Sequence, residues 1–248
     1  PMLSSSGRFA LTFNGEIYNH HDLRELLSTT NPYQHTNSWR GHSDSETLLA
    51  CIEAWGLEKT LQKTVGMFAI ALWDTQTRTL HLVRDRFGEK PLYYGWSTTA
   101  NTAAPAFVFG SELKALRAYP GFANPVSREA LSLYMRFTYV PAPYSIYQNI
   151  FKLEPGCMLS IDTRAALPQA GKLIEAGQVP SMPTAPSAPL RPPATHGGLR
   201  MHRWWSLASV VEAGEKEQIS SEEEVLETLE QRLKDAVRVQ SLADVPLG

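Results

Sequence analysis

Apolar and polar residues change their spacing along the chain, and the changes separate strands from helices. Residues 8–13 alternate in character, which predicts a strand, and Asn14-Gly15 is turn chemistry that should end it. A helix over His20 to Leu27 should follow, with Asn19 as its N-cap. Strands and helices are therefore interleaved from the first thirty residues onward.

The same mixture continues to about residue 162. Ser43-Asp44-Ser45-Glu46 is a capping box and predicts a helix that ends near Gly56. Two runs of β-formers on either side of Asp74–Thr77 predict a buried hairpin. A second strand pair should cover residues 92–96 and 106–109. Three short helices should cover residues 57–64, 112–118 and 127–137. These elements predict an α+β domain with mainly antiparallel sheets.

The composition changes after residue 162. Residues 163–198 contain seven prolines among small and polar residues, so they should form a flexible stretch without a core of its own. An amphipathic helix with acid in its first turn should follow Ser221 and end near Val239. We therefore divide the chain into a first domain (1–162), an insertion or linker (163–203) and the start of another domain (204–248).

Charge and composition narrow the possible partners. The 248 residues include 23 Lys and Arg against 25 Asp and Glu, a net charge of −2, so we expect neither nucleic acid nor a membrane surface as partner. No apolar run is long enough for a membrane span, and the first residues lack a signal peptide pattern. Two cysteines make no disulfide framework, and a cytoplasmic location is the simplest expectation.

Neither metal ligation nor thiol chemistry is evident. The seven histidines have no metal-ligand spacing, so no metal site is expected. Cys51 lies inside an apolar helical run, and Cys157 begins a strand after a Pro-Gly turn. Both are predicted to be buried structural residues, because nothing nearby would lower their pKa.

Three segments share a pattern with a known family. They are Phe13-Asn14-Gly15-Glu16-Ile17-Tyr18-Asn19, Gly41-His42-Ser43-Asp44-Ser45-Glu46 and Asp85-Arg86-Phe87-Gly88-Glu89-Lys90-Pro91-Leu92-Tyr93-Tyr94. Together they resemble the glutamine-hydrolysing half of asparagine synthetases, which are class II glutamine amidotransferases. The resemblance implies an αββα sandwich of the N-terminal-nucleophile hydrolase type, with two mainly antiparallel sheets between helix layers. Ser111 to Leu116 and Tyr139 to Pro143 also follow the family's course, as structural or interface elements.

The resemblance also implies roles for individual residues. Asn14 and Gly15 would form the oxyanion hole, and Glu16 and Asp44 would bind the α-ammonium group of glutamine. Taken alone, Asn14-Gly15 is more often a tight turn, and Glu16 and Asp44 are typical of a solvated acid and a helix-capping acid. The family's nucleophile is an N-terminal cysteine, but no cysteine precedes Cys51, so we expect a fragment that is inactive by itself. The family's carboxylate-binding arginine is not assigned to Arg8.

Three functions remain open at this stage. In the first, ammonia from glutamine passes to a synthetase domain, beginning near residue 204, that uses ATP and Mg²⁺ to amidate aspartate. In the second, the same glutaminase serves another carboxylate, such as a sugar in surface-polysaccharide synthesis. In the third, the domain has the same fold but is not catalytic. This chain itself should need no cofactor, and a homodimer is an open alternative.

Overall fold

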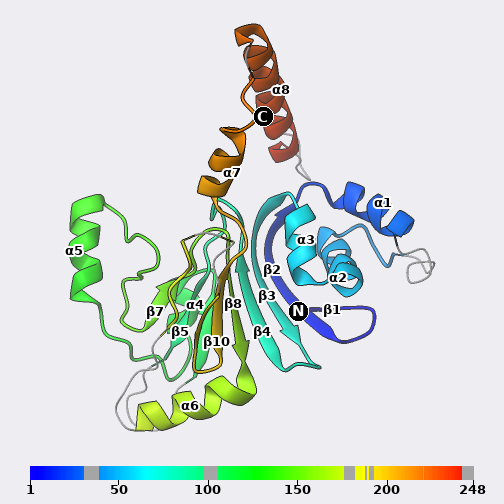
Figure 1. Cartoon of the computed structure of the whole chain (residues 1–248). Helices are drawn as coiled ribbons and strands as arrows, with labels where there is room; N and C mark the ends of the chain where they lie inside the picture. The colour runs from blue at the N-terminus through cyan, green and yellow to red at the C-terminus, as the bar shows by residue number, and fades with distance from the viewer. Residues whose placement is uncertain are drawn as a thin grey trace.

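The computed structural model describes residues 1–30, 39–97, 106–175, 182–187, 189, 193–219 and 221–241. Within them the chain forms two antiparallel sheets with helices around them (Figure 1). The larger sheet has the order β1-β2-β3-β4-β8-β10-β9. Its strands are β1 (Met2–Leu3), β2 (Phe9–Ile17), β3 (Gly66–Asp74), β4 (Thr79–Arg84), β8 (Cys157–Asp162), β9 (Ala194–His196) and β10 (Leu199–Arg203).

The smaller sheet has three strands in the order β6-β5-β7, all antiparallel. They are β5 (Tyr93–Trp96), β6 (Phe107–Gly110) and β7 (Ile150–Lys152). The helices are α1 (His20–Thr30), α2 (Asp44–Trp55), α3 (Leu57–Lys63), α4 (Leu113–Arg117), α5 (Arg128–Phe137), α6 (Thr163–Glu175), α7 (Leu207–Gly214) and α8 (Glu222–Gln240).

Strand β3 shows how the layers are built, because its side chains alternate between two cores. Phe68, Ile70 and Leu72 pack on one face with the buried residues of α1, α2 and α3. Ala69 and Ala71 face the other way, into a second core with residues of the smaller sheet such as Tyr94 and Phe151. Helix α4 packs against β6 of the smaller sheet, through Leu116 and Gly110. The predicted αββα arrangement is therefore confirmed, and so are the hairpin around Asp74 and the second strand pair.

The expectation that Asn14-Gly15 ends the first strand is wrong, because β2 continues through both residues to Ile17. Gly15 pairs with Phe68 on β3, and a Cβ at this position would lie 2.1 Å from the carbonyl oxygen of Met67. The glycine therefore permits a close approach of two backbones inside a strand, which sequence alone does not distinguish from a turn.

The helix starts are partly as expected. Ser43 caps α2 through its side chain, as predicted, and α2 ends before Gly56. The capping box itself is not formed within the described residues, because Glu46 accepts from the amides of Arg40 and Gly41 and not from that of Ser43. Asn19 is not a side-chain cap of α1, however. Its amide donates to the carbonyl of Lys63 and its oxygen accepts from the amide of Val65, so it joins the first helix to the loop before β3.

The predicted flexibility of residues 163–198 is wrong for two parts of that stretch. Residues Thr163–Glu175 form α6, and Ala194–His196 form β9, which pairs with β10 at the edge of the larger sheet. Buried Ala166 anchors α6 in the second core, so tertiary packing overrides the unfavourable Pro168. Residues 176–181, 188 and 190–192 lie outside the described residues.

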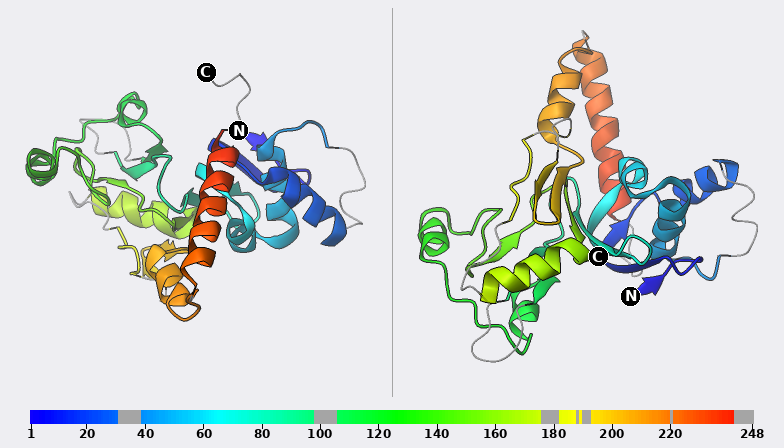
Figure 2. Two further views of the ribbon diagram at one scale, coloured as in Figure 1. Left: turned by 90° about the horizontal axis from the view of Figure 1, so that it is seen from above. Right: turned by 60° about the horizontal axis from the view of Figure 1, so that its bottom comes forward.

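Helices α7 and α8 project away from the sheets (Figures 1 and 2). Helix α8 is the predicted amphipathic helix, and its apolar residues Val225, Leu229, Leu233 and Val237 are exposed. No helix among the described residues is both long and apolar enough to cross a bilayer.

Candidate active site

Asn14 and Glu16 project from the same face of β2, because side chains alternate along a strand. Asn14 pairs with Ala69, whose side chain belongs to the core between the two sheets, so this face looks toward the smaller sheet. Asn14 is exposed, and its side-chain nitrogen donates to the hydroxyl oxygen of Ser111 at 2.9 Å. Ser111 directly follows β6, so one hydrogen bond links the two sheets at this point.

The backbone N–H of Gly15 lies on the edge of β2 that faces away from β3. The amide of Tyr18 donates toward β3, to the carbonyl of Val65, whereas the amide of Ile17 donates to the carboxylate of Asp44 on the opposite edge. Because N–H groups alternate between edges, Gly15 shares the edge of Ile17. Strand β1 pairs only with Ala10 and Leu11, so no strand among the described residues takes the Gly15 N–H.

Asp44 connects the beginning of α2 to this open edge. Its Oδ2 accepts from the amide of Ile17 at 2.9 Å, and its Oδ1 accepts from the amide and the hydroxyl of Ser45 at 2.7 and 3.3 Å. A carboxylate has about four acceptor positions, so Oδ2 has one left. Asp44 is half-buried, and an ammonium group is the kind of donor that suits the remaining position.

Arg24 holds the loop that leads into α2. Its guanidinium donates to the carbonyls of Gly41 and Ser43 at 3.2 and 3.1 Å and to the hydroxyl of Thr47 at 2.7 Å. The carboxylate of Glu46 accepts from the amide of Gly41 at 3.1 Å. The charged side chains thus fix the segment that carries Asp44.

The two cysteines are unsuited to nucleophilic attack. Cys51 and Cys157 are both fully buried, and burial raises the pKa of each thiol to about 12. At neutral pH both therefore stay protonated and inert. The described residues also contain no group of His, Cys, Asp and Glu that could hold a metal ion.

The segment from Arg84 to Lys90 is held in place by many hydrogen bonds. The carboxylate of buried Asp85 accepts from four backbone amides, those of Phe87, Glu89, Lys90 and Phe68, at 3.0–3.2 Å. Arg84 donates to three carbonyls, of Lys90, Leu153 and Gly88. Burial lowers the pKa of Arg84. The loop is structural, in agreement with the interpretation of its sequence.

Arg86, in the same loop, holds the end of α3. Its guanidinium donates to the carbonyls of Leu61, Gln62 and Thr64 at the end of that helix. Burial lowers the pKa of Arg86 too. Helix α3 is therefore tied to the loop that Asp85 organises.

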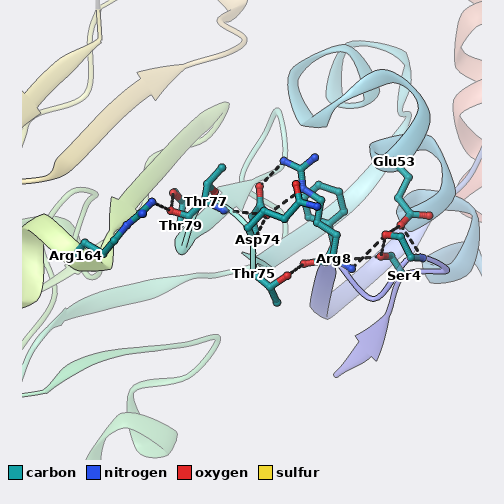
Figure 3. Close-up of polar contacts among 11 residues, drawn as sticks. Ser4, Arg8, Glu53, Asp74, Thr75, Thr77, Thr79 and Arg164 are labelled. Atoms are coloured by element: carbon teal, nitrogen blue, oxygen red, sulfur yellow. Dashed lines mark hydrogen bonds and ion pairs between the residues drawn. The ribbon is translucent and has the colours of Figure 1, made fainter.

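Arg8 lies at the other end of β2, as Figure 3 shows. Its guanidinium makes two hydrogen bonds to the carboxylate of Asp74, at 3.0 and 2.7 Å. Asp74 also accepts from the amides of Gln76 and Thr77, and the hydrogen bond from Arg8 lowers the pKa of Asp74 to about 2. Arg8 is thus engaged in the β3–β4 turn, which agrees with leaving the substrate's carboxylate unassigned to it.

The structure therefore brings together Asn14, Gly15, Glu16 and Asp44 at one end of β2. Sequence reasoning missed the supporting residues Ser111 and Arg24. The only sequence signal for Ser111 was its position in a family-like segment, and no local pattern singles out Arg24, because its partners lie 17–23 residues away.

Comparison with known proteins identifies the family of the domain that carries this site. A glutamine amidotransferase domain family matches residues 1–170. A Mycobacterium bovis protein provisionally named a glutamine-hydrolyzing asparagine synthetase is 40% identical over 157 residues, which are 62% of this chain and 22% of that protein. Asparagine synthetase (glutamine-hydrolyzing) 1 of Bacillus subtilis is 36% identical over 161 residues, which are 65% of this chain and 23% of that protein.

Among solved structures, glutamine phosphoribosylpyrophosphate amidotransferase from B. subtilis matches with a TM-score of 0.40 and 21% identity, covering 66% of this chain and 29% of the other. The chain spans less than a quarter of the length of the two curated relatives named above. The match over residues 1–170 covers more than half of the chain, which therefore belongs to the glutamine amidotransferase domain family.

Proposed function

We propose that this chain forms the glutamine-binding and oxyanion-stabilising part of an amidotransferase that releases ammonia for the ATP-dependent amidation of aspartate. The observation that carries the proposal is the convergence at the open edge of β2. There the side chain of Asn14 neighbours the backbone N–H of Gly15, which no strand among the described residues takes, and two residues further on the N–H of Ile17 donates to the carboxylate of Asp44.

The roles follow from the chemistry of amide hydrolysis. Attack on the carboxamide carbon of glutamine puts negative charge on its oxygen, and the side chain of Asn14 and the N–H of Gly15 are donors for that charge. Asp44 and Glu16 are anions for the α-ammonium group. The nucleophile is neither of the chain's two cysteines, because both thiols are buried and protonated.

The names of the relatives favour aspartate over another carboxylate as the acceptor. In this proposal, a synthetase domain that begins near residue 204 binds ATP and Mg²⁺ and receives the ammonia. Helices α7 and α8 have exposed apolar residues such as Val211 and Leu229, which fit the beginning of a domain whose core lies elsewhere.

The test is steady-state kinetics of the full-length protein with glutamine as nitrogen donor. Asn14→Ala should lower kcat by about 10²–10³-fold with little change in KM, because the oxyanion forms only in the transition state. Asp44→Asn should mainly raise KM for glutamine, because the ammonium contact exists in both states. The opposite pattern would show that the two roles are wrongly assigned.

Two further measurements separate glutamine hydrolysis from synthesis. Free ammonia should restore asparagine formation in both variants, because the amidation step does not need the glutaminase site. The 248-residue chain alone should release no ammonia from glutamine. Release that Cys51→Ala abolishes would contradict the proposal that the buried thiols are inert.

A further inference from the structure

The contact between Asn14 and Ser111 joins residues that are 97 positions apart and belong to different sheets. It is the one side-chain hydrogen bond that Asn14 makes within the described residues. Without this contact the exposed amide of Asn14 would sample a wide range of orientations, since the terminal torsion of asparagine has broad minima. The hydroxyl of Ser111 therefore decides where the amide points.

The number of N–H donors on the amide group makes this contact useful for catalysis. An asparagine side chain has two N–H donors on one nitrogen. When one donates to Ser111, the plane of the amide is set, and the second N–H remains available for a substrate oxygen. A serine hydroxyl that accepts this bond thus orients the donor and does not consume it.

Ser111 is itself held firmly. Gly110, the residue before it, pairs with Tyr93 in the smaller sheet. Leu116 of α4 is buried against Gly110, where an added Cβ would lie 3.0 Å from the Leu116 side chain. Ser111 is therefore fixed from both sides, by a strand before it and a packed helix after it.

We propose that Ser111 is a positioning residue for glutamine hydrolysis, which orients the Asn14 side chain so that its free N–H meets the developing oxyanion. This inference rests on the proposed function. It adds a residue from the smaller sheet to a site whose other groups come from β2 and α2. It also gives the Ser111 segment a role in the reaction beyond structure.

The kinetic test uses the full-length protein. Ser111→Ala should lower kcat for glutamine hydrolysis about 3- to 10-fold, which corresponds to the loss of one ordinary hydrogen bond, and should leave KM within about twofold. Ser111→Thr keeps the hydroxyl and should retain at least about half of the wild-type kcat. Ser132→Ala removes an exposed hydroxyl that donates to the Glu129 carbonyl of its own helix, and serves as the matched control.

A second measurement is independent of catalysis. In protein labelled with ¹⁵N-asparagine, the side-chain amide resonance of Asn14, identified by its loss in Asn14→Ala, should shift in Ser111→Ala and stay unchanged in Ser132→Ala. An unshifted resonance would overturn the inference. So would a Ser111→Ala variant with wild-type kcat, or with a change confined to KM. A wild-type protein that does not hydrolyse glutamine would refute the proposed function, whereas the resonance would still report on the contact.

Discussion

Two aspartates lie on opposite sides of the Gly15–Phe68 pair, and they differ in how fully their carboxylates are used. Asp85 accepts from four backbone amides, including that of Phe68, and is almost completely buried. Asp44 accepts from Ile17 and from the two polar groups of Ser45, and is half-buried. Both residues belong to family-like motifs, so their sequences do not reveal this difference.

The difference distinguishes an acid that holds the fold from one that can bind a ligand. A carboxylate with all its acceptor positions filled by backbone amides has nothing to offer a substrate, and its removal exposes several buried donors. A carboxylate with a free position at an open strand edge costs little to remove but matters when a cation arrives. Mutation of Asp85 should therefore mainly lower stability, whereas mutation of Asp44 should mainly lower the affinity for the substrate.

The largest expected effect belongs to Asp85. Asp85→Ala leaves four backbone N–H groups without an acceptor, so it should lower the free energy of unfolding by about 3 kcal/mol or more. Urea denaturation followed by circular dichroism measures this. Asp235→Ala, which removes a half-exposed acid paired with Arg238 in α8, is the control and should change stability by less than about 0.5 kcal/mol. Equal effects in the two variants would refute the structural role of Asp85.

Asp74 is a third aspartate for this comparison, and its carboxylate, like that of Asp85, is already engaged by donors of the protein. Its pKa is lowered from 3.8 to about 2 by Arg8, so its contribution to stability is complete above about pH 5 and is lost as pH falls toward 2. The contribution is at most about 2 kcal/mol, of which about half should be gone at pH 3. The stability difference between wild type and Asp74→Asn should shrink accordingly between pH 6 and pH 3. A difference that is independent of pH would contradict the Arg8–Asp74 pairing.

Substitution of Arg24 tests whether the loop that leads to Asp44 must be held in place for glutamine binding. Arg24→Met removes donors to Gly41, Ser43 and Thr47 but keeps much of the side-chain volume, so stability should fall by about 1–2 kcal/mol. In the full-length protein, KM for glutamine should rise several-fold while kcat changes less, because the loop that carries Asp44 loses its position. Arg40→Met, on the exposed side of the same loop, is the control. If kcat falls and KM stays constant, Arg24 supports another part of the site.

The smallest effect on stability is expected for Asp44 itself. Asp44→Ala should lower the free energy of unfolding by only about 1 kcal/mol, since two of its three hydrogen bonds are to neighbouring Ser45. Isothermal titration with glutamine should nevertheless show clearly weaker binding in the full-length protein. A loss of stability as large as that of Asp85→Ala would erase the distinction between the two acids.

Local patterns predicted most of the elements, and the errors have identifiable causes. The hairpin around Asp74 and the helix that Ser43 caps were predictable because hydrophobic spacing and capping act over a few residues. The continuation of β2 through Gly15 was not, because it depends on the carbonyl of Met67, more than fifty residues away. Helix α6 was missed because its stabilising contact, at Ala166, is tertiary while Pro168 is visible locally.

The candidate site shows the same limit. Asn14, Gly15, Glu16 and Asp44 were chosen from the family resemblance, and the structure places them near one end of β2. That Asp44 binds the amide of Ile17, and that Ser111 reaches Asn14 from another sheet, depends on how distant segments meet. Such contacts produce no periodic pattern of residues in a single sequence.

The addition of β10 to the larger sheet makes the chain suitable for fragment complementation. Five residue pairs join β10 to β8, Trp204 stacks on Phe68, and Arg203 donates to the carbonyl of Pro155. Because of these contacts, we expect two separately produced polypeptides, residues 1–175 and 193–248, to reassociate without a covalent link. Fused to the halves of a reporter, such a pair would report the assembly of this sheet in a living cell.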